Sequence, residues 1–132
     1  PAIVVDFGTS TNYDVVSERG EFLGGALAPG VEISIDALAA RGARLFKVEL
    51  ARPRSVIGKS TAEALQSGLL FGFVGQVDGI VRRITAELGG QAHVIATGGL
   101  ATLVLEESET IAHHEPDLTL IGLRLVHERN TA

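Results

Sequence analysis

The sequence predicts an α/β domain in which a three-stranded antiparallel meander is extended by parallel strands, with helices packed on the sheet. Three observations support this fold class. Three β-rich runs separated by short polar turns open the chain. Helical and strand-like segments then alternate as far as the C-terminus, which is typical of a parallel extension of a sheet. The length of 132 residues suits one domain with its own core, so we expect residues 1–132 to form a single domain.

The strands of the meander are expected first, and each is a β-rich run that ends at a turn containing glycine or proline. Their expected bounds are Ala2–Val5, Thr11–Ser17 and Glu21–Ala28. The third run contains Gly24 and Gly25, which allow a bulge or a close approach of another backbone.

Two helices are expected next. Apolar residues recur at helical spacing over Val31–Leu45. Ser60 and Glu63 form a capping box, in which the Ser60 hydroxyl accepts from the Glu63 amide and the Glu63 carboxylate reaches back. We expect a long helix from there to Leu88. The segment between the helices, Phe46–Ala51, is expected to be a short strand or an extended arm.

The remaining elements alternate between strand and helix. We expect a strand at His93–Thr97, a helix at Leu100–Leu105, a short strand at Thr110–Ala112 and a helix at Leu118–Arg129 capped by Asp117. His113 and His114 are expected to lie in a solvated loop. A meander followed by this alternation is the order of elements of the ribonuclease-H-like fold.

The composition narrows the class of function. The chain carries 11 basic and 16 acidic residues, a formal charge of −5, which disfavours binding to nucleic-acid phosphates. It has no cysteine, so disulfides, thiolate metal sites and a cysteine nucleophile are excluded. No apolar run in the sequence matches the length of a membrane span, and no leader-like segment opens the chain. We therefore expect a cytoplasmic protein that does not contact a membrane.

The first candidate site is the turn after the first strand. Gly8 frees the backbone there, so that consecutive N–H groups of the turn can face a phosphate, with the hydroxyls of Thr9, Ser10 and Thr11 as further donors. Asp6 at the strand end is a candidate ligand for a hydrated cation. The alternative is a plain hairpin turn, which the same residue types favour.

The second candidate site is Thr97-Gly98-Gly99, where a strand leads into a helix. Glycines there let a ligand lie against the backbone, and a helix N-terminus favours anionic groups. The alternative is a tight strand–helix turn. Both candidate sites follow strand ends, where ligands of open α/β sheets usually bind.

The long helix carries four glycines at steps of four, three and four residues, so that they form one stripe: Gly68, Gly72, Gly75 and Gly79. Each costs about 1 kcal/mol relative to alanine in a helix. The stripe indicates close approach by another backbone. That backbone belongs either to the domain's own sheet or to a second copy of the chain in a homodimer.

Several strings of the sequence resemble the second half of type III pantothenate kinase. They are DFGTST at 6–11, DVV at 14–16, GGA at 24–26, APG at 28–30, VIGK at 56–59, QSG at 66–68, VDG at 77–79, ATGG at 96–99 and LTLIGL at 118–123. They occur in order over almost the whole chain.

The resemblance implies two ribonuclease-H-like halves with ATP in the cleft between them, phosphorylation of pantothenate, and a homodimer. It also implies Mg²⁺ and a monovalent cation, K⁺ or NH₄⁺. By resemblance, Gly8, Thr9 and Ser10 bind phosphate, with Asp6 near the cations. Thr97, Gly98 and Gly99 contact adenosine, and Thr61 reaches the pantothenate site of the partner subunit.

The resemblance also implies what this chain lacks. The first half of the family's chain is not present, and the first phosphate loop and the aspartate that serves as general base belong to it. Asn12 and Ser60 stand where the family has threonine and asparagine. We therefore expect a half-kinase that is inactive alone. Two alternatives are a stand-alone structural module without a ligand and a two-metal nuclease using Asp6 and Asp14.

Overall fold

The computed structural model describes residues 1–42 and 44–132 and confirms a mixed α/β architecture. Five strands form one sheet in the order β3-β2-β1-β4-β5. β1, β2 and β3 form an antiparallel meander, whereas β4 and β5 continue it in parallel with β1. Their bounds are β1 Ala2–Phe7, β2 Ser10–Val16, β3 Phe22–Pro29, β4 His93–Thr97 and β5 His113–His114.

β1 is the central strand of the sheet, and its residues alternate between the two faces. Ile3, Val5 and Phe7 are buried, whereas the intervening residues are only partly buried. This alternation has the period of two that a strand with one covered face requires. In the register of the sheet, Asp6 of β1 lies opposite Asn12 of β2 on one side and Thr97 of β4 on the other.

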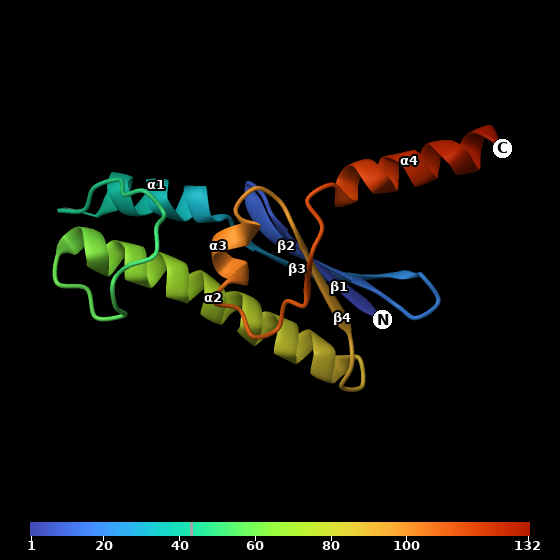
Figure 1. Cartoon of the computed structure of the whole chain (residues 1–132), viewed down its shortest axis with the longest axis horizontal. Coiled ribbons are helices and arrows are strands. Elements are labelled where there is room, and N and C mark those ends of the chain that lie inside the picture. Colours follow the sequence, from blue (N-terminus) through green and yellow to red (C-terminus); the bar gives the residue numbers. More distant parts are fainter. Residues whose placement is uncertain (43) are drawn as a thin grey trace.

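Four helices complete the described part of the chain: α1 Val31–Arg41, α2 Thr61–Glu87, α3 Ala101–Leu105 and α4 Leu118–Thr131. The C-terminal half of α2 and α3 cover the buried face of the sheet, where their side chains join the core formed by β1, β2 and β4. The N-terminal half of α2 extends beyond the sheet and packs beside α1 (Figure 1). The chain therefore has two adjoining hydrophobic cores that share one helix.

α2 is long and apolar enough to cross a membrane by length and composition alone, with a mean hydropathy of 1.3 over its most apolar window. Its apolar side chains nevertheless have another explanation. Leu69 and Phe73 belong to the core with α1, and Val77 and Val81 to the core with the sheet. A long core helix passes the same test, so packing accounts for this composition.

Most expected elements are confirmed, and the differences lie at their ends. β1 continues through Asp6 and Phe7, so that the turn after it is tighter than predicted. The prediction of a helix over 31–45 is too long, because α1 ends at Arg41 and the Gly42 amide donates to the Leu38 carbonyl at 2.9 Å. Leu38, which the apolar spacing places on the buried face of this helix, is exposed in the structure.

Residues 46–51 are not in a strand, so the extended arm is the correct alternative there. Within this arm Val48 is buried against α1 and α2. At the start of α2 the Ser60 hydroxyl accepts from the Glu63 amide at 3.2 Å, as predicted. The Glu63 carboxylate reaches back as predicted, since it accepts from the Lys59 amide at 2.7 Å, and it also pairs with Arg54.

Two predictions near the C-terminus are wrong. The short strand lies at His113–His114 instead of 110–112, so the two histidines form β5 rather than a solvated loop. The reason is that residues 108–111 are bonded to α2, as described below, and the chain pairs with β4 only afterwards. Asp117 precedes α4 without a side-chain capping bond to any described residue.

Candidate functional site

The turn between β1 and β2 is formed by Gly8 and Thr9, both of which are exposed. The Gly8 amide donates to the Ser10 carbonyl at 3.1 Å, and the Ser10 hydroxyl donates to Asn12 Oδ1 at 2.8 Å. The turn is thus a tight hairpin in which the Gly8 N–H is already used. The Thr9 hydroxyl remains on the surface of this end of the sheet.

Gly98 follows β4 and lies against the backbone of β1. Its φ is +95°, a conformation that other residues rarely adopt. A Cβ at this position would lie 2.5 Å from the Phe7 carbonyl oxygen and 2.8 Å from the Phe7 amide nitrogen. Only glycine fits this contact, which holds the loop after β4 against the strand that leads into the Gly8–Thr9 turn.

Gly30 makes a second contact of this kind. It is the N-cap residue of α1, and a Cβ there would lie 2.1 Å from the Thr9 carbonyl oxygen and 2.7 Å from that of Gly8. The β1–β2 turn, the β3–α1 junction and the β4–α3 loop therefore meet at one end of the sheet. Both candidate segments predicted from the sequence belong to this glycine-lined end.

The predicted contact residues differ in how accessible they are. Thr97 is buried, with 5% of its surface exposed, and Gly98 is partly buried. Gly99 is exposed, and no heavy atom of the described residues comes within 4 Å of where its Cβ would be. Asp6 is partly buried, and its Oδ1 lies 3.9 Å from the position of a Cβ on Gly8. A ligand at this end would thus meet mainly exposed backbone.

Thr61 is not part of this cluster. It is exposed at the first position of α2, at the end of the helix that lies beside α1 and away from the sheet (Figure 1). The preceding loop folds back onto this end, because a Cβ on Gly58 would lie 2.4 Å from the Ala64 amide nitrogen. The Arg54 guanidinium and the Lys59 amide both donate to Glu63 and lower the pKa of its carboxyl group.

Metal ligands do not gather in the described part of the chain, which contains no group of three or more His, Asp or Glu side chains able to hold an ion. Asp6 is therefore a single candidate ligand. The nuclease alternative, which needs several carboxylates at one point, has no support from the residues that the structure describes.

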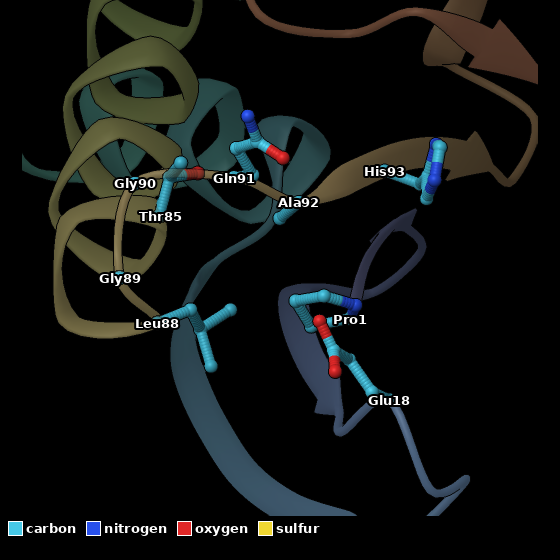
Figure 2. A pocket seen from close by; sticks show the side chains of 9 residues that line it. All are labelled: Pro1, Glu18, Thr85, Leu88, Gly89, Gly90, Gln91, Ala92 and His93. Atoms are coloured by element: carbon cyan, nitrogen blue, oxygen red, sulfur yellow. The ribbon is translucent and has the colours of Figure 1, made fainter.

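The most voluminous of the described cavities, about 680 Å³, lies elsewhere (Figure 2). Its lining includes Pro1, Glu18 and His93 with the Gly89–Gly90 turn. Pro1 and His93 lie at the start of β1 and β4, whereas the candidate site follows the ends of these strands. Volume alone therefore does not point to the candidate site.

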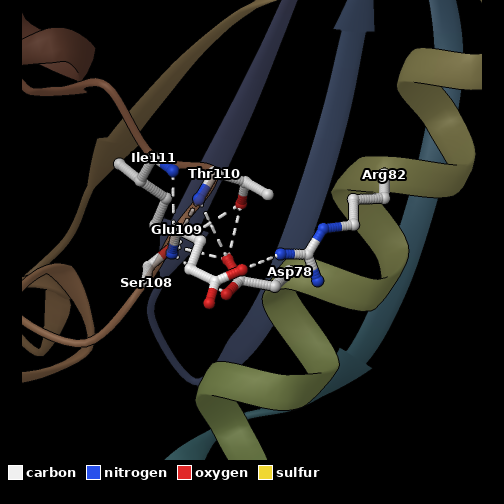
Figure 3. A network of polar contacts seen from close by, with 6 residues as sticks. All are labelled: Asp78, Arg82, Ser108, Glu109, Thr110 and Ile111. Carbon is white, nitrogen blue, oxygen red and sulfur yellow. Dashed lines mark hydrogen bonds and ion pairs between the residues drawn. The ribbon is translucent and has the colours of Figure 1, made fainter.

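A buried polar cluster that the sequence analysis missed surrounds Asp78 on α2 (Figure 3). Its carboxylate accepts from the Ser108 hydroxyl at 2.6 Å, the Thr110 hydroxyl at 2.7 Å and the Glu109 amide at 3.0 Å. Burial alone would raise the pKa of Asp78, but these hydrogen bonds outweigh it and lower the pKa. The sequence contained one indication of this cluster, namely a single aspartate, Asp78, within an apolar stretch of the long helix.

The Asp78 cluster has a structural role. It anchors the loop between α3 and β5 to α2, and the Arg82–Glu109 ion pair lies at its edge (Figure 3). Ser108 in turn accepts from the Ile111 amide at 3.3 Å, so that the loop is also bonded within itself. This anchoring positions the loop so that the residues after it pair with β4 as the edge strand β5.

A family model for type III pantothenate kinase matches residues 1–83, more than half of the chain. The chain belongs to the type III pantothenate kinase family. The match includes the Asp6–Ser10 turn, Thr61 and the glycine stripe of α2.

Similar full-length proteins extend the match beyond residue 83. The chain is 74% identical over 130 residues to a type III pantothenate kinase of Frankia alni and 72% identical over 131 residues to one of a Parafrankia species. These alignments cover 98% and 99% of this chain but 52% of each relative. The chain therefore spans about half the length of the curated relatives that it matches, and they give no support to a stand-alone structural module.

A solved structure shares the fold. A protein described as a Baf family transcriptional activator from Campylobacter jejuni superposes with a TM-score of 0.69 at 20% identity, covering 98% of this chain and 58% of that one. At this identity the likeness concerns the fold alone. The curated relatives and the solved structure are both longer than this chain, which covers 52% of each relative and 58% of the solved structure.

Proposed function

We propose that this chain is the nucleotide-binding second half of a type III pantothenate kinase, the enzyme that phosphorylates pantothenate in coenzyme A synthesis. We also propose that its fold is ribonuclease-H-like and that residues 1–132 form one domain. The sheet order β3-β2-β1-β4-β5, with a meander extended in parallel, supports this assignment. The membership in the family supports the activity of the whole enzyme, of which this chain supplies one side of the cleft.

The observation that carries the proposal is the meeting of three segments at one end of the sheet, where Gly98 packs on Phe7 and Gly30 packs on the Gly8–Thr9 turn. Gly8, Thr9 and Gly99 are exposed at this end of the sheet. Such a surface suits a polyphosphate lying over the turn and an adenosine lying over the loop at Gly99. The exposed Thr9 lies beside the expected phosphate position, whereas the Ser10 hydroxyl donates to Asn12 and Thr97 is buried beside the expected adenosine position.

Asp6 is suited to serve as one of several ligands of Mg²⁺. Mg²⁺ in kinases usually keeps several waters and takes one or two carboxylates together with the substrate phosphates. One partly buried carboxylate beside the phosphate turn meets this requirement without a cage of protein ligands. We extend the proposal to ATP with Mg²⁺ and, by the family resemblance, to K⁺ or NH₄⁺.

Homodimerisation through α2 is also part of the proposal. Gly68, Gly72 and Gly75 are exposed, and no heavy atom of the described residues lies within 4 Å of where their Cβ atoms would be. The alternative that the stripe packs against the domain's own sheet is therefore wrong. An exposed stripe of glycines lets a second helix approach more closely than the usual 8–10 Å. Thr61 at the start of the same helix would then face the partner subunit.

Titration with ATP and Mg²⁺, followed by amide chemical shifts, tests the proposed site. Shifts are expected at residues 8–10 and 97–99, with a binding free energy of about 5 kcal/mol, because an open half-cleft covers little of the ligand. Gly99→Val is expected to abolish the shifts without disturbing the fold, and Gly122→Val on α4 is the matched control. Shifts confined to the cavity near Pro1 and His93 would refute the assignment.

A further inference from the structure

The first turns of the last helix, residues 118–126, are predominantly apolar. Six of the nine residues from 118 to 126 are leucine, isoleucine or valine, and at 3.6 residues per turn they point in all directions around the axis. Thr119 and Arg124 are the polar side chains of these turns, so the apolar surface is not confined to one face of the helix. A helix of this composition is normally surrounded by protein. The following residues, 127–131, are all polar.

In this structure α4 has no such surroundings. None of its 14 residues, all of which the structure describes, is buried. Leu120 and Leu123 are 64% and 62% exposed, and Val126 is 58% exposed. Figure 1 shows α4 leaving the sheet after β5 and pointing away from α1, α2 and α3. The described part of the chain therefore does not contain the surface that α4 is built to contact.

The relatives indicate where that surface lies. Alignments covering 98% or 99% of this chain span only 52% of the two relatives, so nearly half of each relative lies outside the match. Patches of apolar surface on this scale mark interaction sites. A second copy of α4 is a poorer occupant, because two helices in contact cover one stripe each and leave the remaining apolar sides of both exposed.

We propose that residues 118–126 of α4 dock into the half of the kinase that this chain does not span, as an apolar plug that joins the two halves. The occupant is a groove or a sheet face, since only such a surface covers more than one side of a helix. The polar end of α4, from His127 onward, then emerges into solvent. This inference concerns assembly and does not depend on nucleotide binding.

Co-expression tests the docking. The chain is produced together with the half of the Frankia alni relative to which it does not align, and the products are purified through a tag on that half. We expect a 1:1 complex by light scattering and slow hydrogen exchange at residues 118–126, which exchange rapidly in the chain alone. The double variant Leu120→Asp/Leu123→Asp is expected to reduce recovery of the complex at least tenfold.

The control carries the same charge change on the same helix. Asn130→Asp/Thr131→Asp is expected to leave recovery unchanged. Because α4 contributes no buried residue, both double variants should keep the circular dichroism of the parent chain. Three results would overturn the inference: failure to recover a complex, equal recovery with both double variants, or slow exchange of α4 in the chain alone. A dimer of the chain alone that Leu120→Asp/Leu123→Asp dissociates would assign α4 to a second copy instead.

Discussion

Asp78 on α2 and Thr110 in the loop before β5 are joined by two hydrogen bonds, although 32 positions separate them in the chain. The Thr110 hydroxyl and amide both donate to Asp78 Oδ1, at 2.7 and 3.2 Å. With Ser108 and Glu109 this makes one carboxylate the acceptor of four donors. The loop that leads to the edge strand is thereby fixed to the longest helix.

Replacing Asp78 by asparagine is expected to destabilise the fold by roughly 1–3 kcal/mol, because buried donors lose their charged acceptor. Since the pKa of Asp78 is lowered in the folded state, its contribution is present above the unfolded pKa of about 3.9 and is lost as the pH falls through the folded value. Urea denaturation at a series of pH values measures both effects.

The exposed Asp117 provides the control, and Asp117→Asn should change the free energy of unfolding by less than about 0.5 kcal/mol. The difference between wild type and Asp78→Asn should shrink toward low pH. A difference that stays constant down to acidic pH would show that the ionised carboxylate is not what stabilises the loop.

The burial of Tyr13 predicts that the free energy of unfolding decreases at alkaline pH. Tyr13 is fully buried under α2, where its hydroxyl donates to Gln76 at 3.3 Å and burial raises its pKa to about 12. Between pH 10 and 12 the unfolded chain releases this proton and the folded chain keeps it, so stability falls as the pH rises. The loss is roughly 2–3 kcal/mol over this range.

Tyr13 is the only tyrosine and the chain has no tryptophan. Near-ultraviolet absorbance of tyrosinate therefore reports this residue alone. Tyr13→Phe should remove its contribution to the alkaline loss of stability. Titration of the folded protein near pH 10, the ordinary value for tyrosine, would contradict the prediction.

Adjacent glycines after β4 are expected to respond differently to alanine. Gly98→Ala forces a positive φ, at about 1–2 kcal/mol, and adds the contact with Phe7. Gly99→Ala meets no described atom and should stay within about 0.5 kcal/mol. Thermal unfolding followed by circular dichroism compares the two, and equal melting temperatures would mean that the loop is not held against β1.

Gly72→Leu is expected to convert a dimer of the chain into a folded monomer, because the leucine projects from the exposed stripe of α2. Helix propensity favours the substitution by about 1 kcal/mol, so unfolding of the variant is not expected. Light scattering gives the mass of the wild type and of the variant. A wild-type chain that is monomeric at high micromolar concentration would exclude dimerisation through α2.

The chain alone is expected to phosphorylate pantothenate at least two to four orders of magnitude more slowly than the full-length Frankia alni relative, since loss of a general base alone costs about this much. On the proposed function, the other half of the phosphate clamp also belongs to the part of the relatives that this chain does not span. Coupled detection of ADP release measures the turnover. Robust pantothenate-dependent release by the pure chain would show that one half suffices.

Sequence alone predicted those features that depend on local pattern. The bounds of β4 and the cap of α2 at Ser60 follow from β-rich composition and a capping motif, and both are confirmed. The end of α1 and the position of β5 were wrong, because each depends on contacts with distant residues. The Asp78 cluster also depends on contacts between distant residues, because nothing in the sequence around Ser108 and Thr110 indicates that they bind Asp78.

The candidate site likewise has features that local sequence predicts and features that depend on the three-dimensional fold. Gly8 and Gly98 were recognised as turn glycines from their neighbours in sequence. Their meeting through Phe7, and the contribution of Gly30 from a third segment, depend on strand order, which the local pattern does not contain. The accessibility of Gly99 compared with Thr97 likewise depends on packing.

β1 is both the first strand of the chain and the centre of the sheet. During synthesis β2 and β3 can pair with it at once, because a meander needs only local contacts. Its other edge waits for β4, which begins at His93, while α1 and α2 are still being made. Until then an apolar strand presents unpaired backbone groups to any other chain. We therefore expect a chain that ends between β3 and β4 to associate with other chains more readily than one that contains β4.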